Sequence, residues 1–131
     1  MRRVIGARAL GELRDEGALE LLVSLLKDDD TTLVQTAERA LVLLTRQDFG
    51  ESHRKWQTWA EKNAHRHRIE WLIDGLLHEN ETLRAAAGDE LKRITQEYYG
   101  FHPASPRKDR ERVQRKYLAW WSQDGKRRFA T

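Results

Sequence analysis

Apolar residues recur at helical spacing along the chain, and three segments share one pattern. The segments are residues 3–13, 34–45 and 84–95. Each carries small residues, then a leucine, then another apolar residue three positions later. The leucines are Leu10, Leu41 and Leu91, and the later apolar residues are Leu13, Leu44 and Ile94. Apolar residues three and four positions apart form one face of a helix, so the pattern predicts three equivalent helices.

Two of these helices are preceded by another amphipathic segment. Residues 18–27 and 69–78 each contain a Leu-Leu pair, which is followed by acidic residues and threonine. Asp30 or Thr31 in the first copy, and Asn80 in the second, are suited to begin the next helix, because short polar side chains accept hydrogen bonds from its first turn. The sequence therefore predicts a helical hairpin that occurs twice.

Each hairpin is followed by a similar aromatic segment. The sequence RQDFG at 46–50 matches QEYYG at 96–100, and each glycine is placed to end its helix in the left-handed conformation. An aromatic pair spaced by three follows, Trp56 and Trp59 in the first copy and Tyr117 and Trp120 in the second, where eleven more residues intervene. We therefore expect a short third helix in each repeat. The expected helices span 2–13, 17–27, 31–46, 52–63, 66–78, 82–97 and 108–122.

The hairpin pattern resembles the short HEAT-like repeats of phycobilin lyases and bacterial scaffold proteins. The step of 31 residues from Leu10 to Leu41 matches the short form of that repeat, and Arg3 and Arg84 keep its arginine, whereas Val34 departs from it. The aromatic ending resembles a HEAT variant found in bacterial repeat proteins. The resemblance implies an all-α fold, a right-handed α-solenoid of about seven helices.

The repeats divide the 131 residues into parts of one expected domain. These parts are a half repeat at 2–13, repeats with an extra helix at 17–63 and 66–122, and a basic tail at 123–131. Helix 2–13 matches the second helix of a hairpin, but its first helix is missing. Since a repeat array needs a polar cap at its end, we expect helix 2–13 to continue a longer array or to pair with another copy or with a partner.

Several features bear on catalysis and location. The chain has no cysteine, no signal-peptide pattern and no run of about 20 apolar residues, so we expect a cytoplasmic protein that does not enter a membrane. Asp48-Phe49-Gly50 spells a kinase metal motif, but the other kinase elements are missing. The five histidines lack metal-ligand spacing. We therefore expect neither enzymatic activity nor a metal or other cofactor.

The five tryptophans have two interpretations. They fill the wedges between helices, or they offer a stacking platform for bases or another ligand. Their recurrence at equivalent positions favours a place in the core. Trp121 lies next to Trp120 and therefore points elsewhere, so we expect it to be the most exposed of the five.

Charge is spread unevenly along the chain. Residues 1–100 carry 15 Lys/Arg against 18 Asp/Glu, whereas residues 101–131 carry 9 against 3. The candidate basic patch is Arg107, Lys108, Arg112, Arg115 and Lys116. A nucleic-acid-binding module that uses this segment is the alternative function, although a net acidic repeat region argues against a broad phosphate-binding face.

The leading hypothesis is a non-enzymatic scaffold or adaptor that binds another protein. In helical solenoids the second helices of the hairpins line the binding surface. The residues turned away from the apolar stripe, and so the candidate partner-binding face, are Gln35, Glu38, Arg39, Val42, Ala85, Asp89, Lys92 and Arg93. A role as an accessory to a phycobilin lyase is a third option, but no residue of the chain points to tetrapyrrole chemistry.

Overall fold

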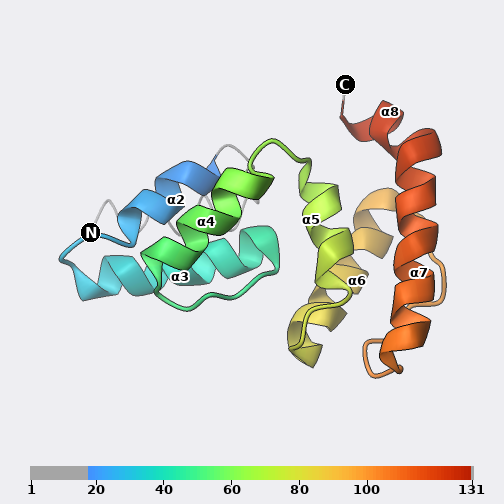
Figure 1. The fold of residues 1–131 in the computed structure, drawn as a ribbon, viewed down its shortest axis with the longest axis horizontal. Helices are drawn as coiled ribbons and strands as arrows, with labels where there is room; N and C mark the ends of the chain where they lie inside the picture. The colour runs from blue at the N-terminus through green and yellow to red at the C-terminus, as the bar shows by residue number, and fades with distance from the viewer. Residues whose placement is uncertain (1–17, 131) are drawn as a thin grey trace. The chain divides into compact units, whose positions relative to one another are not determined.

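The fold of the described residues is all-α, as the sequence predicts. The structure is a computed structural model that describes residues 18–130, and every regular element within that range is helical. The elements are α2 (Leu19–Leu25), α3 (Thr31–Thr45), α4 (His53–Asn63), α5 (Arg68–Gly75), α6 (Glu81–Thr95), α7 (Arg107–Trp120), a π-helical turn (Trp121–Gly125) and α8 (Lys126–Phe129) (Figure 1).

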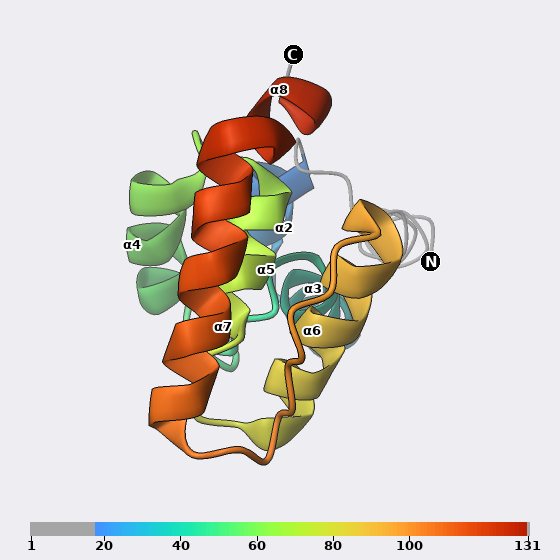
Figure 2. The ribbon, with the colours of Figure 1, turned by 90° about the vertical axis from the view of Figure 1, so that its right-hand side faces the viewer.

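The chain divides into two compact units, residues 1–68 and residues 69–131. In the first unit α2 packs against both α3 and α4. In the second, α5, α6 and α7 surround a common apolar core, and Figure 2 shows α7 running alongside α5. The single domain and the solenoid arrangement stay predictions, and helix 2–13 lies outside the described residues.

The long helices begin where the sequence predicts. The Asp30 side chain accepts hydrogen bonds from the backbone N–H of Thr32 at 2.9 Å and of Leu33 at 3.2 Å. The Asn80 side chain accepts one from the N–H of Leu83 at 3.2 Å. Both residues thereby satisfy donors that the first turn of a helix leaves without partners. Asp30 and Asn80 are confirmed as the caps of α3 and α6.

The long helices end earlier than the glycines suggest. The residues that take the left-handed conformation at the ends of α3 and α6 are Arg46, with φ 56°, and Gln96, with φ 62°. Gly50 and Gly100 also have positive φ angles, of 59° and 79°, but they lie four residues farther on, in the loop. The prediction that these glycines end the helices is therefore wrong.

A threonine explains the early end. The Thr45 hydroxyl donates to the Leu41 carbonyl at 2.8 Å and accepts from the Gln47 N–H at 3.1 Å. Fifty residues later, the Thr95 hydroxyl donates to the Leu91 carbonyl and accepts from the Glu97 N–H at 3.1 Å. Each hydroxyl thus joins the last helical turn to the loop, and both threonines are fully buried.

An aromatic contact then holds the third helix of each unit to the loop. The rings of Phe49 and Trp56 meet edge to face with centroids 4.9 Å apart, and the Trp56 indole donates to the Gly50 carbonyl at 2.8 Å. In the second unit the rings of Tyr99 and Tyr117 meet in the same way at 4.8 Å. Edge-to-face pairs of this kind add stability beyond the area they bury. We call each such set, which consists of the threonine, the loop backbone and the aromatic pair, a joint.

The end of α7 differs from the sequence expectation. Trp121 is buried, so the prediction that it is the most exposed tryptophan is wrong. Trp121 begins the π-helical turn, and the centroid of its ring lies 6.2 Å from that of the Trp120 ring. Both rings lie over Gly125, where an added Cβ would be 2.7 Å from the Trp120 ring. The helix then continues to Phe129, whose ring packs against Trp120, rather than ending in the basic tail expected from residue 123.

The apolar stripe of α6 also differs from that of α3. Leu44 is fully buried, but its counterpart Ile94 is 38% exposed, so the prediction that Ile94 belongs to the buried face is wrong. At the end of α3 the guanidinium of Arg68 covers the backbone, since it donates to the carbonyls of Leu44 at 2.8 Å and Leu43 at 3.2 Å. The spacing of apolar residues along α3 cannot predict this contact, because Arg68 belongs to a later segment of the chain.

The joint of the second unit predicts a dependence on pH. The Tyr117 hydroxyl donates to the Glu97 carbonyl at 2.9 Å, and burial raises the pKa of Tyr117 to about 12. Because the unfolded pKa is about 10, this tyrosine contributes its full stability below pH 10 and loses it as the pH rises through 12. Tyr117→Phe should cost about 1 kcal/mol at neutral pH by urea unfolding, and that deficit should shrink above pH 10.

Tyr98→Phe is the control for this measurement, because the Tyr98 side chain is 52% exposed and lies outside the joint. It should leave the unfolding midpoint unchanged. A Tyr117→Phe protein as stable as the wild type at neutral pH would contradict the buried hydrogen bond.

Candidate binding surfaces

The predicted face on α3 is accessible. Gln35 and Arg39 are exposed, and Glu38 and Val42 are partly exposed. Partial burial, and then the charges of Asp48 and Glu51, raise the pKa of Glu38, whereas Arg39 acts in the opposite direction. The predicted face on α3 thus carries one cation, Arg39, and lies near the acidic residues Asp48 and Glu51 of the segment that follows the helix.

The predicted face on α6 is more exposed and borders a hollow. Asp89, Lys92 and Arg93 are exposed, and Ala85 is partly exposed. The first three line a shallow hollow of about 300 Å³ together with Gln96 and Tyr98. The Lys92 ammonium lies 4.5 Å above the Tyr98 ring, a cation–π arrangement.

Sequence reasoning missed the exposed aromatic residue at this surface, Tyr98, and the exposure of Ile94 elsewhere on α6. Ile94 and Tyr98 are among the large hydrophobic side chains that the structure leaves exposed. A signal for Tyr98 was present, because the aligned residue in the first repeat is the polar Asp48. The side chain at this loop position is not part of the joint. An aromatic residue that replaces the aspartate there therefore has no place in the core.

The predicted basic patch lies on α7, and all five of its residues are exposed. Two of them are paired with carboxylates, Arg107 with Glu111 at 2.9 Å and Arg112 with Asp109 at 3.4 Å. Lys108, Arg115 and Lys116 have no carboxylate at ion-pair distance within residues 18–130. The surface is therefore less basic than the run of sequence suggests.

A second hollow, of about 240 Å³, lies beside this patch. Its lining includes Arg110, Arg112 and Lys116 from α7 and His102 from the preceding loop. Burial, followed by the charges of Arg84 and Arg107, lowers the pKa of Arg110, whose Nε donates to the Ser105 carbonyl at 3.0 Å. The loop between α6 and α7 is thus packed against several cations.

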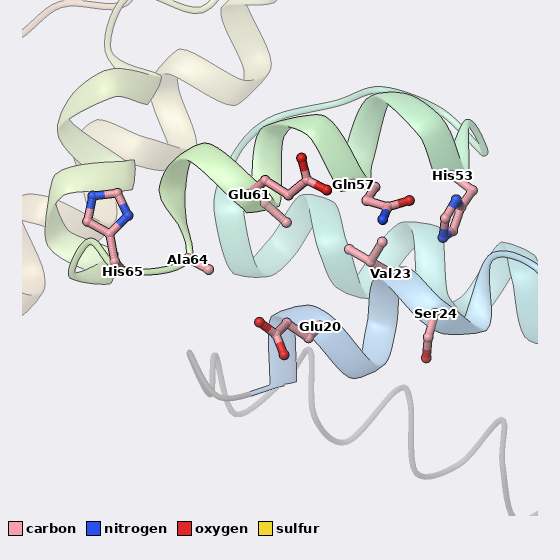
Figure 3. Close-up of a pocket in the computed structure, with 9 residues that line it drawn as sticks. Glu20, Val23, Ser24, His53, Gln57, Glu61, Ala64 and His65 are labelled. Atoms are coloured by element: carbon pink, nitrogen blue, oxygen red, sulfur yellow. The ribbon is translucent and has the colours of Figure 1, made fainter.

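A hollow of about 400 Å³ lies between α2 and α4 (Figure 3). Val23 and Ala60 give it an apolar part, while Glu20 on α2 and Glu61 on α4 border it from opposite sides. His53 and His65 lie at its two ends rather than together. Within residues 18–130, no three His, Cys, Asp or Glu side chains form a group that could hold a metal ion.

The opposite side of α4 borders the largest of these hollows, about 640 Å³. Phe49 and Trp59 supply aromatic surface, and Arg54, Lys55 and Lys62 supply positive charge. Trp59 is partly exposed, whereas the other tryptophans, Trp56, Trp71, Trp120 and Trp121, are buried. One side of α4 therefore borders a hollow with two glutamates, whereas the other borders a hollow with aromatic rings and positive charge.

Comparison with known proteins gives this chain no relative: no family model, no curated protein and no solved structure matches it. Among the described helices, none has both the length and the apolar character needed to cross a bilayer. The surfaces described above are consequently the basis for a functional proposal.

The exposure of Trp59 predicts a fluorescence result. Trp59→Phe should remove most of the tryptophan emission that dissolved iodide quenches, because the other four indoles are buried. Iodide should also quench the wild type more than caesium does, since three cations surround Trp59.

Trp120→Phe, at the equivalent position of the second repeat, serves as the control and should leave the amount of quenchable emission unchanged. Equal loss of quenching in both variants would contradict the difference in exposure.

Proposed function

We propose that this chain is a non-enzymatic interaction module of HEAT-repeat type that binds another protein through the exposed sides of α3 and α6. In this proposal the helical hairpins stack as a right-handed solenoid, and the second helix of each hairpin contributes to one binding face. The partner is a protein whose surface offers both apolar and charged groups.

The exposed pair Ile94 and Tyr98 carries the proposal. They leave 38% and 52% of their area open to solvent, and Tyr98 lines the hollow together with Asp89, Lys92 and Arg93. Protein interfaces are enriched in tyrosine and arginine, and their strongest contacts come from aromatic and arginine side chains in a pocket. A tyrosine held by a lysine beside a shallow hollow supplies such a contact with little loss of side-chain entropy.

The chemistry of the α2–α4 hollow supports a binding role more than a catalytic one. A general acid or base is recognised by a perturbed titratable group next to a second functional group. Here His53 and His65 lie at opposite ends of the hollow, and Glu20 on α2 and Glu61 on α4 border it from opposite sides. This separation of the titratable side chains supports a role in binding.

Nucleic-acid binding by the basic patch is the second candidate. Lys108, Arg115 and Lys116 favour it, because they are exposed and have no carboxylate nearby within the described residues. The ion pairs of Arg107 and Arg112 weaken it, since paired cations release fewer counterions on binding phosphate. Self-association through helix 2–13 is a further proposal that concerns residues outside the described part.

The protein-binding proposal is tested by changing the exposed pair. Full-length protein carrying Ile94→Glu and Tyr98→Ala should lose a partner that the wild type captures from its native cell extract. In a titration with the purified partner, its affinity should fall about thirtyfold or more, as for a binding hot spot.

Leu118→Glu is the matched control, because Leu118 is 39% exposed on α7. It introduces the same charge at a site of the same exposure and should leave capture unchanged. Capture that survives the α6 changes, or that the Leu118 change abolishes equally, would contradict the assignment to α6.

A further inference from the structure

The outer side of α4 carries three cations that have no acidic partner. Arg54, Lys55 and Lys62 are all exposed and line the 640 Å³ hollow. None of them has a carboxylate at ion-pair distance within residues 18–130, and no acidic side chain is part of the lining. The hollow is therefore suited to a ligand with negative charge.

Aromatic rings lie among these cations. Phe49 and Trp59 line the hollow, and both contact the buried Trp56 edge to face, with ring centroids at 4.9 Å and 6.3 Å. Trp56 is in turn fixed by its hydrogen bond to the Gly50 carbonyl. The two partly exposed rings are thus supported by contacts with the joint, so a planar ligand can stack on them without first ordering the site.

The order of residues along α4 places one lysine before the Trp59 ring and one after it. Lys55, Trp59 and Lys62 are spaced by four and three residues, so they share one stripe of α4. At about 1.5 Å per residue, the two lysines are separated by about 10 Å along the helix axis. An aromatic surface with a cation before it and after it matches a base whose backbone carries a phosphate on either side.

We propose that the outer side of α4 binds single-stranded nucleic acid. A base enters the hollow and stacks on Trp59 and Phe49, while Arg54, Lys55 and Lys62 contact the neighbouring phosphates. This site is separate from the basic patch on α7 and from the α6 surface of the proposed function.

The second repeat supplies an internal comparison. Arg115 and Lys116 stand two residues and one residue before Tyr117, as Arg54 and Lys55 stand before Trp56, and both are exposed. The ring that corresponds to Trp59 is Trp120, which is only 8% exposed because Trp121 and Phe129 pack against it. The second repeat therefore keeps the two cations but lacks the accessible ring.

The shape of the α4 surface argues against an anionic membrane as its ligand. Residues that bind the membrane interface extend apolar side chains beyond the surrounding surface. Phe49 and Trp59 are instead partly buried and line a concavity. An acidic peptide would satisfy the cations, but it would leave the supported aromatic floor with little to contact.

The test is fluorescence anisotropy of a labelled oligothymidylate of about 12 nucleotides, a length within the usual range of single-strand sites. The full-length wild type should bind it at low salt. With three phosphates contacted, the logarithm of the binding constant should fall with the logarithm of salt concentration with a slope of about −2.

Two variants test the parts of the site separately. Trp59→Ala should weaken binding by about fivefold or more through loss of stacking. The triple change Arg54→Ala, Lys55→Ala and Lys62→Ala should remove most of the salt dependence, and it affects only exposed side chains, so its fold is expected to persist. Circular dichroism of each variant checks that expectation.

The matched control is Lys27→Ala, which removes an exposed cation of the first unit that belongs to neither candidate nucleic-acid surface. It should keep the affinity within about twofold of the wild type. Absence of binding at low salt overturns the proposal, and so does an equal loss of affinity in the control. Equally tight binding of a DNA duplex, of polyglutamate or of vesicles containing anionic lipid through the same α4 residues overturns it as well.

Discussion

The buried threonine at the end of each long helix is the constraint on which the other features of each unit depend. Its hydroxyl is bonded on one side to the helix and on the other to the loop, so the chain leaves the helix in one direction only. That direction places Phe49 or Tyr99 where it meets an aromatic residue of the third helix. A helix as short as α4, which is polar over most of its surface, has little stability alone and depends on this contact.

The same joint supports different surfaces in the two units. In the first, Trp56 is buried and leaves Trp59 beside it partly accessible among three cations. In the second, the π-helical turn and Phe129 cover the equivalent Trp120, and the accessible aromatic residue is Tyr98 at the end of α6. Because the side chains outside the joint differ, we propose that α4 of the first unit contacts a nucleic acid, whereas the exposed sides of α3 and α6 contact a protein.

The helices of residues 18–130 and the caps of α3 and α6 could be predicted because they depend on local spacing and on short polar side chains. Asp30 and Asn80 act within three residues of their own positions. The burial of Trp121 could not be predicted in this way, because it depends on an irregular element, and the spacing of apolar residues does not distinguish the exposed Ile94 from the buried Leu44. Arg68 covers α3 across more than 20 residues of sequence, and a π-helical turn changes the direction of every side chain after it. The accessible ring of Trp59 likewise differs from its counterpart Trp120 because Trp121 and Phe129 cover the latter.

A double-mutant cycle on Phe49 and Trp56, repeated on Tyr99 and Tyr117, tests most directly whether one joint organises both units. Each single change to leucine and each pair of changes is measured by equilibrium unfolding. The account predicts a coupling free energy of about 0.5–1.5 kcal/mol within each pair, similar in the two units. A coupling free energy near zero in either pair would contradict the account.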